Sequence, residues 1–146
     1  MPQIPTCQFG LFDYDPAAVV EFPTGLPGFE TERRFVLIER PALAPVLFLQ
    51  SLTSPGVCFP AAPVHSIDPQ YELAVTPEDL ALLGVDPAQP VLALAILSAP
   101  ENAPLTANLL APVVIDPQSR RAVQSVRIDR RYSHRQELAS REAACS

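Results

Sequence analysis

Lysine and tryptophan are absent from the 146 residues, and the chain has only five glycines, two histidines and three cysteines. All ten basic residues are therefore arginines, and 16 acidic residues outnumber them, for a net charge of −6. Phosphate backbones are bound by arrays of basic side chains, so we expect no direct binding of nucleic acid. The net negative charge favours a basic protein partner instead.

The charge is unevenly distributed along the chain. Residues 1–119 carry three arginines and 13 acidic residues, whereas residues 120–146 carry seven arginines and three acidic residues. The first region predicts an acidic surface. The arginines of the second region either form a small anion site or, as is more common for such a cluster, are solvated or pair with the protein's own carboxylates.

The cysteines and histidines are too few and too scattered for a metal centre. Cys7, Cys58 and Cys145 have no C-x-x-C spacing, and His65 and His134 lie far apart in the sequence. Zinc needs three or four ligands, so we expect no metal and no cofactor. The odd number of cysteines favours reduced thiols in the cytoplasm over a set of disulfide bonds.

Nothing in the sequence predicts a membrane protein or a secreted protein. The longest apolar run, residues 91–97, is far shorter than the roughly 18 residues that a membrane-spanning helix needs. The first residues lack the charged and apolar regions of a signal peptide. We therefore expect a cytoplasmic protein that does not bind membranes.

Common catalytic signatures are missing as well, including G-x-S-x-G, the Walker A loop and G-x-G-x-x-G. Cys58 and His65 are a conceivable nucleophile and base, but a core thiol and a loop imidazole are favoured. Paired carboxylates such as Glu78 and Asp79 would have to face each other across a cleft. We expect no enzyme activity and retain a thiol or carboxylate hydrolase as an alternative.

Eighteen prolines interrupt the chain and exclude a long-helix bundle or coiled coil. Apolar and β-branched segments between turn residues predict short strands. These segments are residues 8–14, 18–22, 35–39, 46–52, 57–60, 91–97, 111–116 and 122–129. The pattern predicts an all-β fold, either a small antiparallel β-sandwich or a barrel-like domain of short strands with one short helix.

Two further details follow from the same pattern. Residues 8–14 and 18–22 are separated by an Asp-Pro turn dipeptide and are expected to pair with each other. Residues 91–97 are apolar at every position, which is typical of a central strand covered on both faces. We expect a single domain over residues 1–135, followed by a polar, flexible C-terminal tail over residues 136–146.

The segment from Thr76 to Gly84 contains the one clear helix signal. Thr76 is a good N-cap, Pro77 suits the first helical position, and Gly84 suits the C-terminal end. A helix of about two turns is stable only when its apolar face packs on other structure. That face is expected to carry Leu80 and Leu83.

Five segments together resemble a known family. They are Phe22-x-x-Gly-Leu-Pro-Gly-Phe-Glu30, Arg34-Phe-Val-Leu37, Phe48-Leu-Gln-Ser51, Thr106-Ala-Asn-Leu-Leu-Ala-Pro-Val-Val-Ile-Asp116 and Tyr132-Ser-x-Arg135. In this order and at these separations, over about residues 8–135, they resemble the bacterial flagellar assembly factor FliW. Members of that family are small cytoplasmic β-rich proteins, which agrees with the strand pattern.

The resemblance implies a regulator without catalysis that binds two proteins, newly made flagellin and the small RNA-binding translational repressor CsrA. When flagellin has been exported, the freed factor binds CsrA away from its RNA-binding face and relieves repression of flagellin mRNA translation. The alternative is a flagellin-specific holding chaperone without CsrA regulation, whose apolar groove covers an amphipathic flagellin helix. We expect the free protein to be a monomer.

The contact surface is expected at exposed polar positions. The candidates are Glu30, Glu32, Tyr71, Glu72 and Asn108. Acidic side chains next to aromatic ones suit the docking of a basic protein.

Overall fold

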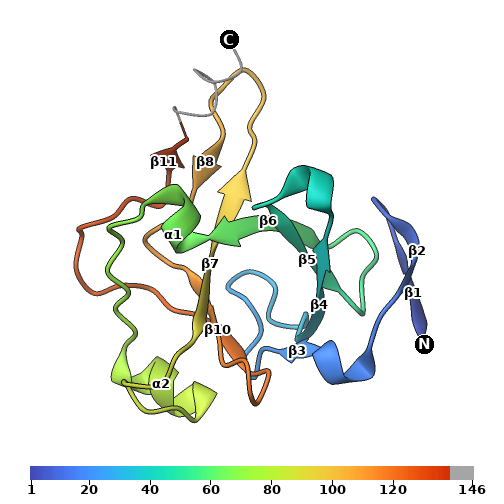
Figure 1. Ribbon diagram of the computed structural model, residues 1–146, viewed down its shortest axis with the longest axis horizontal. Coiled ribbons are helices and arrows are strands. Elements are labelled where there is room, and N and C mark those ends of the chain that lie inside the picture. The colour runs from blue at the N-terminus through green and yellow to red at the C-terminus, as the bar shows by residue number, and fades with distance from the viewer. Residues whose placement is uncertain (139–146) are drawn as a thin grey trace.

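Eleven short strands and two short helices make up the part of the chain that the computed structural model describes, residues 1–138 (Figure 1). The strands are β1 (Gln3–Thr6), β2 (Gly10–Asp13), β3 (Val20–Glu21), β4 (Arg34–Glu39), β5 (Leu47–Ser51), β6 (Cys58–Pro63), β7 (Leu92–Ser98), β8 (Thr106–Ala107), β9 (Val113–Ile115), β10 (Ala122–Gln124) and β11 (Gln136–Glu137). The helices are α1 (Val64–Ile67) and α2 (Pro77–Leu83), and single 3-10 turns cover Pro16–Ala18 and Pro41–Leu43.

Seven of the strands form an antiparallel sheet that curls into a barrel. Their spatial order is β10-β9-β7-β6-β5-β4-β3, and β3 and β10 are the two end strands. The ends meet where the Glu21 amide donates to the Arg120 carbonyl at 2.8 Å, beside a parallel bridge between Glu21 and Arg121. The predicted antiparallel, barrel-like fold is therefore confirmed.

Side chains alternate between the inside and the outside of this barrel. The largest buried cluster takes alternate residues of each strand, for example Phe35 in β4, Leu49 in β5 and Leu94 in β7. The residues between them, such as Ile38 and Leu97, belong to separate clusters on the outer face. A sheet buried on both faces needs apolar residues at successive positions, which explains the continuous apolar run of β7.

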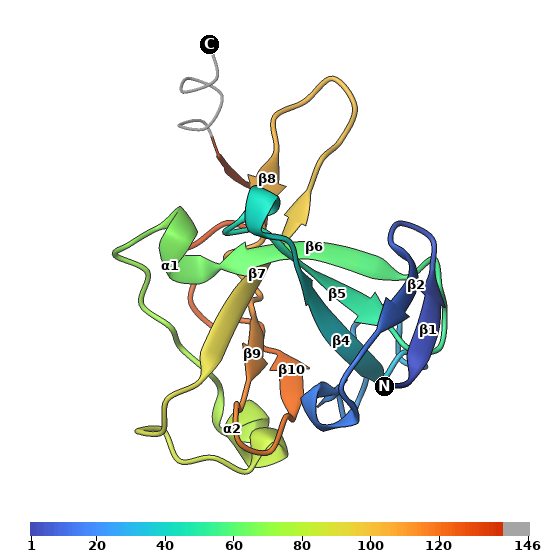
Figure 2. The same ribbon diagram turned by 45° about the vertical axis from the view of Figure 1, so that its right-hand side comes forward.

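Three elements cover different parts of the outer face (Figures 1 and 2). The β1–β2 hairpin packs on β4 through Ile4, α1 packs on β6 and β7 through Val64, and α2 packs on β9 and β10 through Leu83. β7 pairs with β6, β8 and β9, so the prediction that it is a central strand is confirmed.

The predicted helix is present as α2. The Thr76 hydroxyl accepts a hydrogen bond from the Asp79 amide at 3.2 Å, and Gly84 ends the helix at a left-handed φ of 72°. Leu83 is fully buried, as expected, whereas Leu80 is half-buried. No helix among residues 1–138 has the length and apolar character needed to cross a membrane.

The expected pairing of residues 8–14 with residues 18–22 is wrong. β2 pairs with β1, and β3 pairs with β4. The Asp15 carboxylate accepts a hydrogen bond from the Ala17 amide and caps a 3-10 turn, which replaces the expected hairpin turn. β1 escaped prediction because it contains Pro5, which is tolerated in a strand that has a single partner.

Other elements differ from the prediction as well: the strand predicted over residues 122–129 is β10, which ends at Gln124. β6 continues past Pro60 to Pro63, because the pairing with β7 begins only at Ala61 and Pro60 faces β5 alone. β8 and β11 are two residues long, too short for a periodic pattern, and pair with each other. β11 lies at the start of the predicted tail, of which residues 139–146 lie outside the described part of the chain.

Candidate protein-binding site

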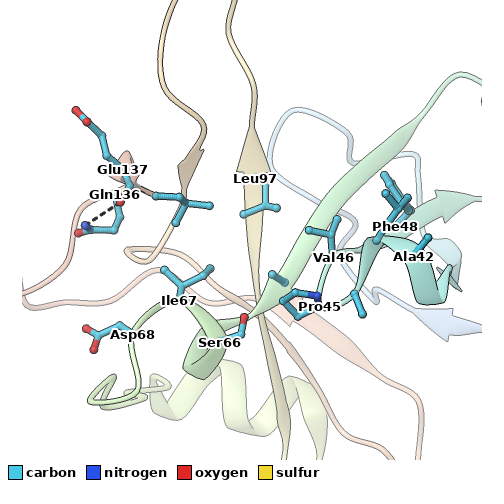
Figure 3. A pocket seen from close by; sticks show the side chains of 14 residues that line it. Ala42, Pro45, Val46, Phe48, Ser66, Ile67, Asp68, Leu97, Gln136 and Glu137 are labelled. Carbon is cyan, nitrogen blue, oxygen red and sulfur yellow. Dashed lines mark hydrogen bonds between the residues drawn. The ribbon is translucent and has the colours of Figure 1, made fainter. Parts of the chain in front are cut away.

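An open groove with a volume of about 590 Å³ crosses the outer face of the barrel between the Pro41–Leu43 turn, α1 and β11. Its floor is apolar, with Val46, Phe48 and Leu97 arranged around the centre of Figure 3. Neither the β1–β2 hairpin nor α2 lines the groove. The groove therefore lies on the outer face between α1 and the Pro41–Leu43 turn, where Val46 and Phe48 are half-buried and Leu97 is buried.

Carboxylates line one side of this groove. Figure 3 shows Asp68 and Glu137 on the same side as Ile67, across Leu97 from Phe48. None of the lining residues is an arginine or a histidine. The groove therefore combines an apolar floor with an acidic rim.

A second hollow, of about 650 Å³, has a lining that mixes apolar and polar residues. Ile96 and Gln124 line it from β7 and β10, and Asn108, Arg135 and Glu137 line it from the C-terminal half of the chain. Ile96 packs against the cluster inside the barrel, so this cleft opens beside the barrel core. Glu137 lines both hollows, which places the cleft and the groove on either side of the β8–β11 pair.

Two segments that carry the family resemblance meet beside this cleft. The Leu109 amide donates to the Ser133 carbonyl at 3.0 Å, which joins residues 106–116 to residues 132–135. The Tyr71 hydroxyl also donates to the Leu109 carbonyl, at 2.8 Å. These contacts fix the backbone from which Asn108 and Arg135 reach the cleft.

A buried arginine ties these segments together. Arg127 lies with its guanidinium carbon 5.3 Å from the ring centroid of Tyr71 and 4.7 Å from that of Tyr132. Its Nε donates to the Asp129 carboxylate at 2.9 Å and its Nη1 donates to the Glu72 carbonyl. The hydrogen bond between Arg127 and Asp129 raises the pKa of the arginine and lowers the pKa of the aspartate, so both side chains stay charged.

Within residues 1–138, salt bridges join Arg127 to Asp129 and Arg131 to Glu72. These two arginines pair with the protein's own carboxylates, which was one of the expectations for the arginine-rich region. Burial raises the pKa of Tyr71, which therefore remains a neutral hydrogen-bond donor. The cluster holds the fold together and presents no free anion site at Arg127.

The first two predicted contact residues lie in the loop before β4 and differ in exposure. Glu30 is exposed and accepts a hydrogen bond from the Gly28 amide at 2.9 Å. Glu32 is buried, and its carboxylate accepts hydrogen bonds from the hydroxyls of Ser51 and Ser54 at 2.5 and 2.8 Å. The expectation that Glu32 is exposed is wrong, because these two serines satisfy its carboxylate inside the fold.

The other three candidates lie near one another, away from Glu30 and Glu32. Glu72 is exposed and paired with Arg131, and Asn108 is half-buried with its side-chain oxygen bonded to the amides of residues 110 and 111. Tyr71 is only 4% exposed, so the expectation of exposure is wrong for it as well. Tyr71 packs against Tyr132 with ring centroids 4.4 Å apart.

The groove residues were missed as contact candidates. Val46, Phe48 and Leu97 lie in segments predicted as apolar strands, and none of them was named as a contact residue. An outward apolar residue has the same sequence pattern whether another element covers it or leaves it open. No signal in the sequence alone separates these two cases.

The structure keeps the conceivable nucleophile and base apart. Cys58 begins β6 and His65 follows its end, so roughly 20 Å of extended strand separates them. Burial raises the pKa of the Cys58 thiol, which opposes its activation as a nucleophile. No group of three or more His, Cys, Asp or Glu side chains in the described chain is placed to hold a metal ion.

The fold and the site define a small antiparallel β-barrel protein with open surface hollows for ligands of substantial size. The model of the FliW protein family matches residues 3–138. The chain therefore belongs to the FliW family, and the resemblance seen in the sequence is confirmed.

Similar proteins agree over nearly the whole chain. The flagellar assembly factor FliW of Symbiobacterium thermophilum is 38% identical over 122 residues, which cover 82% of this chain and 88% of that protein. The protein of the same name from Heliobacterium modesticaldum is 32% identical over 137 residues, which cover 93% and 90%. A crystal structure of the flagellar assembly factor FliW superposes with a TM-score of 0.85 at 30% identity, covering 94% of this chain and 96% of that one.

Proposed function

We propose that this chain is a cytoplasmic flagellar assembly factor that switches between two protein partners. It binds flagellin while flagellin is present. When flagellin has been exported, it binds the translational repressor CsrA and relieves repression of flagellin mRNA translation. Membership of the FliW family supports the role in flagellar assembly.

The observation that carries the switch is the meeting of two hollows at Glu137. The groove and the cleft are separated by β8 and β11, which are two residues long each. Two proteins seated in neighbouring hollows would collide or would move the same short strands. Binding of one partner is therefore expected to weaken binding of the other.

Charge supports a basic partner such as an RNA-binding protein. The net charge is −6, and the exposed acids include Glu30, Glu72 and Glu137. Complementary charge speeds encounter and makes binding sensitive to salt. We expect the complex with CsrA to weaken as the salt concentration rises.

The test is titration calorimetry of the purified chain with purified CsrA, repeated after saturation with flagellin. The proposal expects stoichiometric binding of CsrA that flagellin abolishes. A titration in which both partners bind at once without mutual effect would contradict the switch.

The same experiment decides between the proposal and its alternative. Tight binding of flagellin without any heat or complex with CsrA would leave a flagellin-specific holding chaperone. Sedimentation of the free chain at several concentrations checks the expectation of a monomer.

A further inference from the structure

We infer that the apolar groove binds one face of an amphipathic α-helix that carries lysine or arginine beside its apolar stripe. This inference rests on the proposed function, because flagellin is the partner expected to supply the helix. It adds the place of binding and the chemistry that the groove selects.

The shape of the groove favours a helix face. A helix with its side chains is 10–12 Å across, so an open groove of about 590 Å³ takes one face of it and leaves the other face in solvent. The floor offers the half-buried Val46 and Phe48 as apolar contacts, and the edge offers Leu43, which is 47% exposed. Side chains at positions i, i+3, i+4 and i+7 of a bound helix would pack against such a floor.

The charge of the rim selects among amphipathic helices. Asp68 and Glu137 lie along one side of the groove, and no basic side chain among residues 1–138 lines it. Neither carboxylate forms a salt bridge within residues 1–138. A helix with basic residues beside its apolar stripe meets these carboxylates, whereas an acidic helix is repelled.

A second copy of this chain does not offer such a helix among its described residues. α1 is a single turn, and α2 carries Glu78 and Asp79 in its first turn while its buried residue Leu83 already packs on β9 and β10. The acidic first turn of α2 would face the acidic rim. The occupant is therefore a helix from another protein.

The first experiment changes three residues that line the groove and uses matched controls elsewhere. The double variant Asp68→Lys with Glu137→Lys reverses the rim, and Leu43→Glu, at a side chain 47% exposed, places a charge at the apolar edge. The controls are Glu78→Lys with Asp86→Lys, which change the charge equally, and Leu11→Glu on the β1–β2 hairpin. Circular dichroism checks that each variant is folded.

Affinity for purified flagellin is then measured for every variant. We expect each groove variant to bind about tenfold or more weakly, and the controls to stay within about twofold of the unsubstituted chain. Groove variants that bind flagellin as tightly as the unsubstituted chain would overturn the inference while leaving the proposed function intact.

A second experiment does not depend on flagellin. An 18-residue helical peptide with lysines beside one leucine stripe is compared with the same peptide carrying glutamates. The lysine peptide should bind the unsubstituted chain and lose affinity for the double variant, whereas the glutamate peptide should prefer the double variant. Equal binding of both peptides, or concentration-dependent dimers of the free chain that the groove variants abolish, would overturn the inference.

Discussion

The guanidinium of Arg127 lies beside the packed rings of Tyr71 and Tyr132, with its carbon 5.3 and 4.7 Å from the two ring centroids. Tyr71 precedes α2 in the chain, whereas Tyr132 lies close to β11. One buried cation therefore joins two segments that are distant in the sequence. Because the Tyr71 hydroxyl also donates a hydrogen bond to the Leu109 carbonyl, the same cluster supports the segment that leads to the cleft.

Substitution of Arg127 by methionine is expected to lower the free energy of unfolding by about 3 kcal/mol, because it leaves buried polar partners without a donor. Urea unfolding followed by circular dichroism measures the loss. The control is Arg130→Met, at an exposed arginine that forms no salt bridge within residues 1–138, which should change stability by no more than about 0.5 kcal/mol. Equal losses in the two variants would contradict a structural role for Arg127.

Gly25 and Gly28 form a matched pair for testing backbone geometry. Both have positive φ, 71° and 83°, but a Cβ added at Gly25 would lie 2.5 Å from the Glu30 carbonyl oxygen, whereas one added at Gly28 meets nothing within 4 Å. Gly28→Ala should cost about 1 kcal/mol from the left-handed backbone alone. Gly25→Ala adds the overlap with fixed backbone atoms and should cost about 3 kcal/mol. Thermal unfolding ranks the two, and a reversed order would count against the described loop.

Glu32→Ala is expected to reduce stability without changing partner affinity. Its carboxylate is buried and accepts from Ser51 and Ser54, so its loss should cost about 2 kcal/mol. Glu30→Ala, at an exposed position, should cost about 0.5 kcal/mol or less. Chemical unfolding and flagellin titration are measured on both variants. A folded Glu32→Ala variant with normal stability and weakened binding would show that Glu32 acts at the interface.

Acid should destabilise the protein partly through Asp129. The hydrogen bond from Arg127 lowers its pKa in the folded state below the value of about 3.9 in the unfolded chain. Its contribution to stability is therefore complete above about pH 4 and is lost as the pH falls through the lowered pKa. Unfolding midpoints between pH 6 and pH 2 should depend less on pH in Asp129→Asn than in the unsubstituted chain. Asp86→Asn, at an exposed carboxylate, is the control and should leave that dependence unchanged.

Local signals predicted individual elements well. Thr76 and Gly84 bound α2 because capping depends on the chemistry of one residue and its near neighbours. The apolar run of residues 91–97 predicted the central strand β7 because both faces of the sheet are covered there. Strand pairing was harder, since the Asp15 carboxylate caps a 3-10 turn where a hairpin turn was expected.

The candidate site depended on contacts between distant segments. The sequence by itself determined the short-strand β fold, the helix α2 and the segments of the FliW family, because these follow from residue type and spacing. Only the tertiary structure decided that Glu32 and Tyr71 are buried, since their partners Ser51 and Leu109 come from other parts of the chain. It also decided that a groove stays open beside the half-buried Val46 and Phe48, because whether an apolar strand residue is covered depends on which element packs over it.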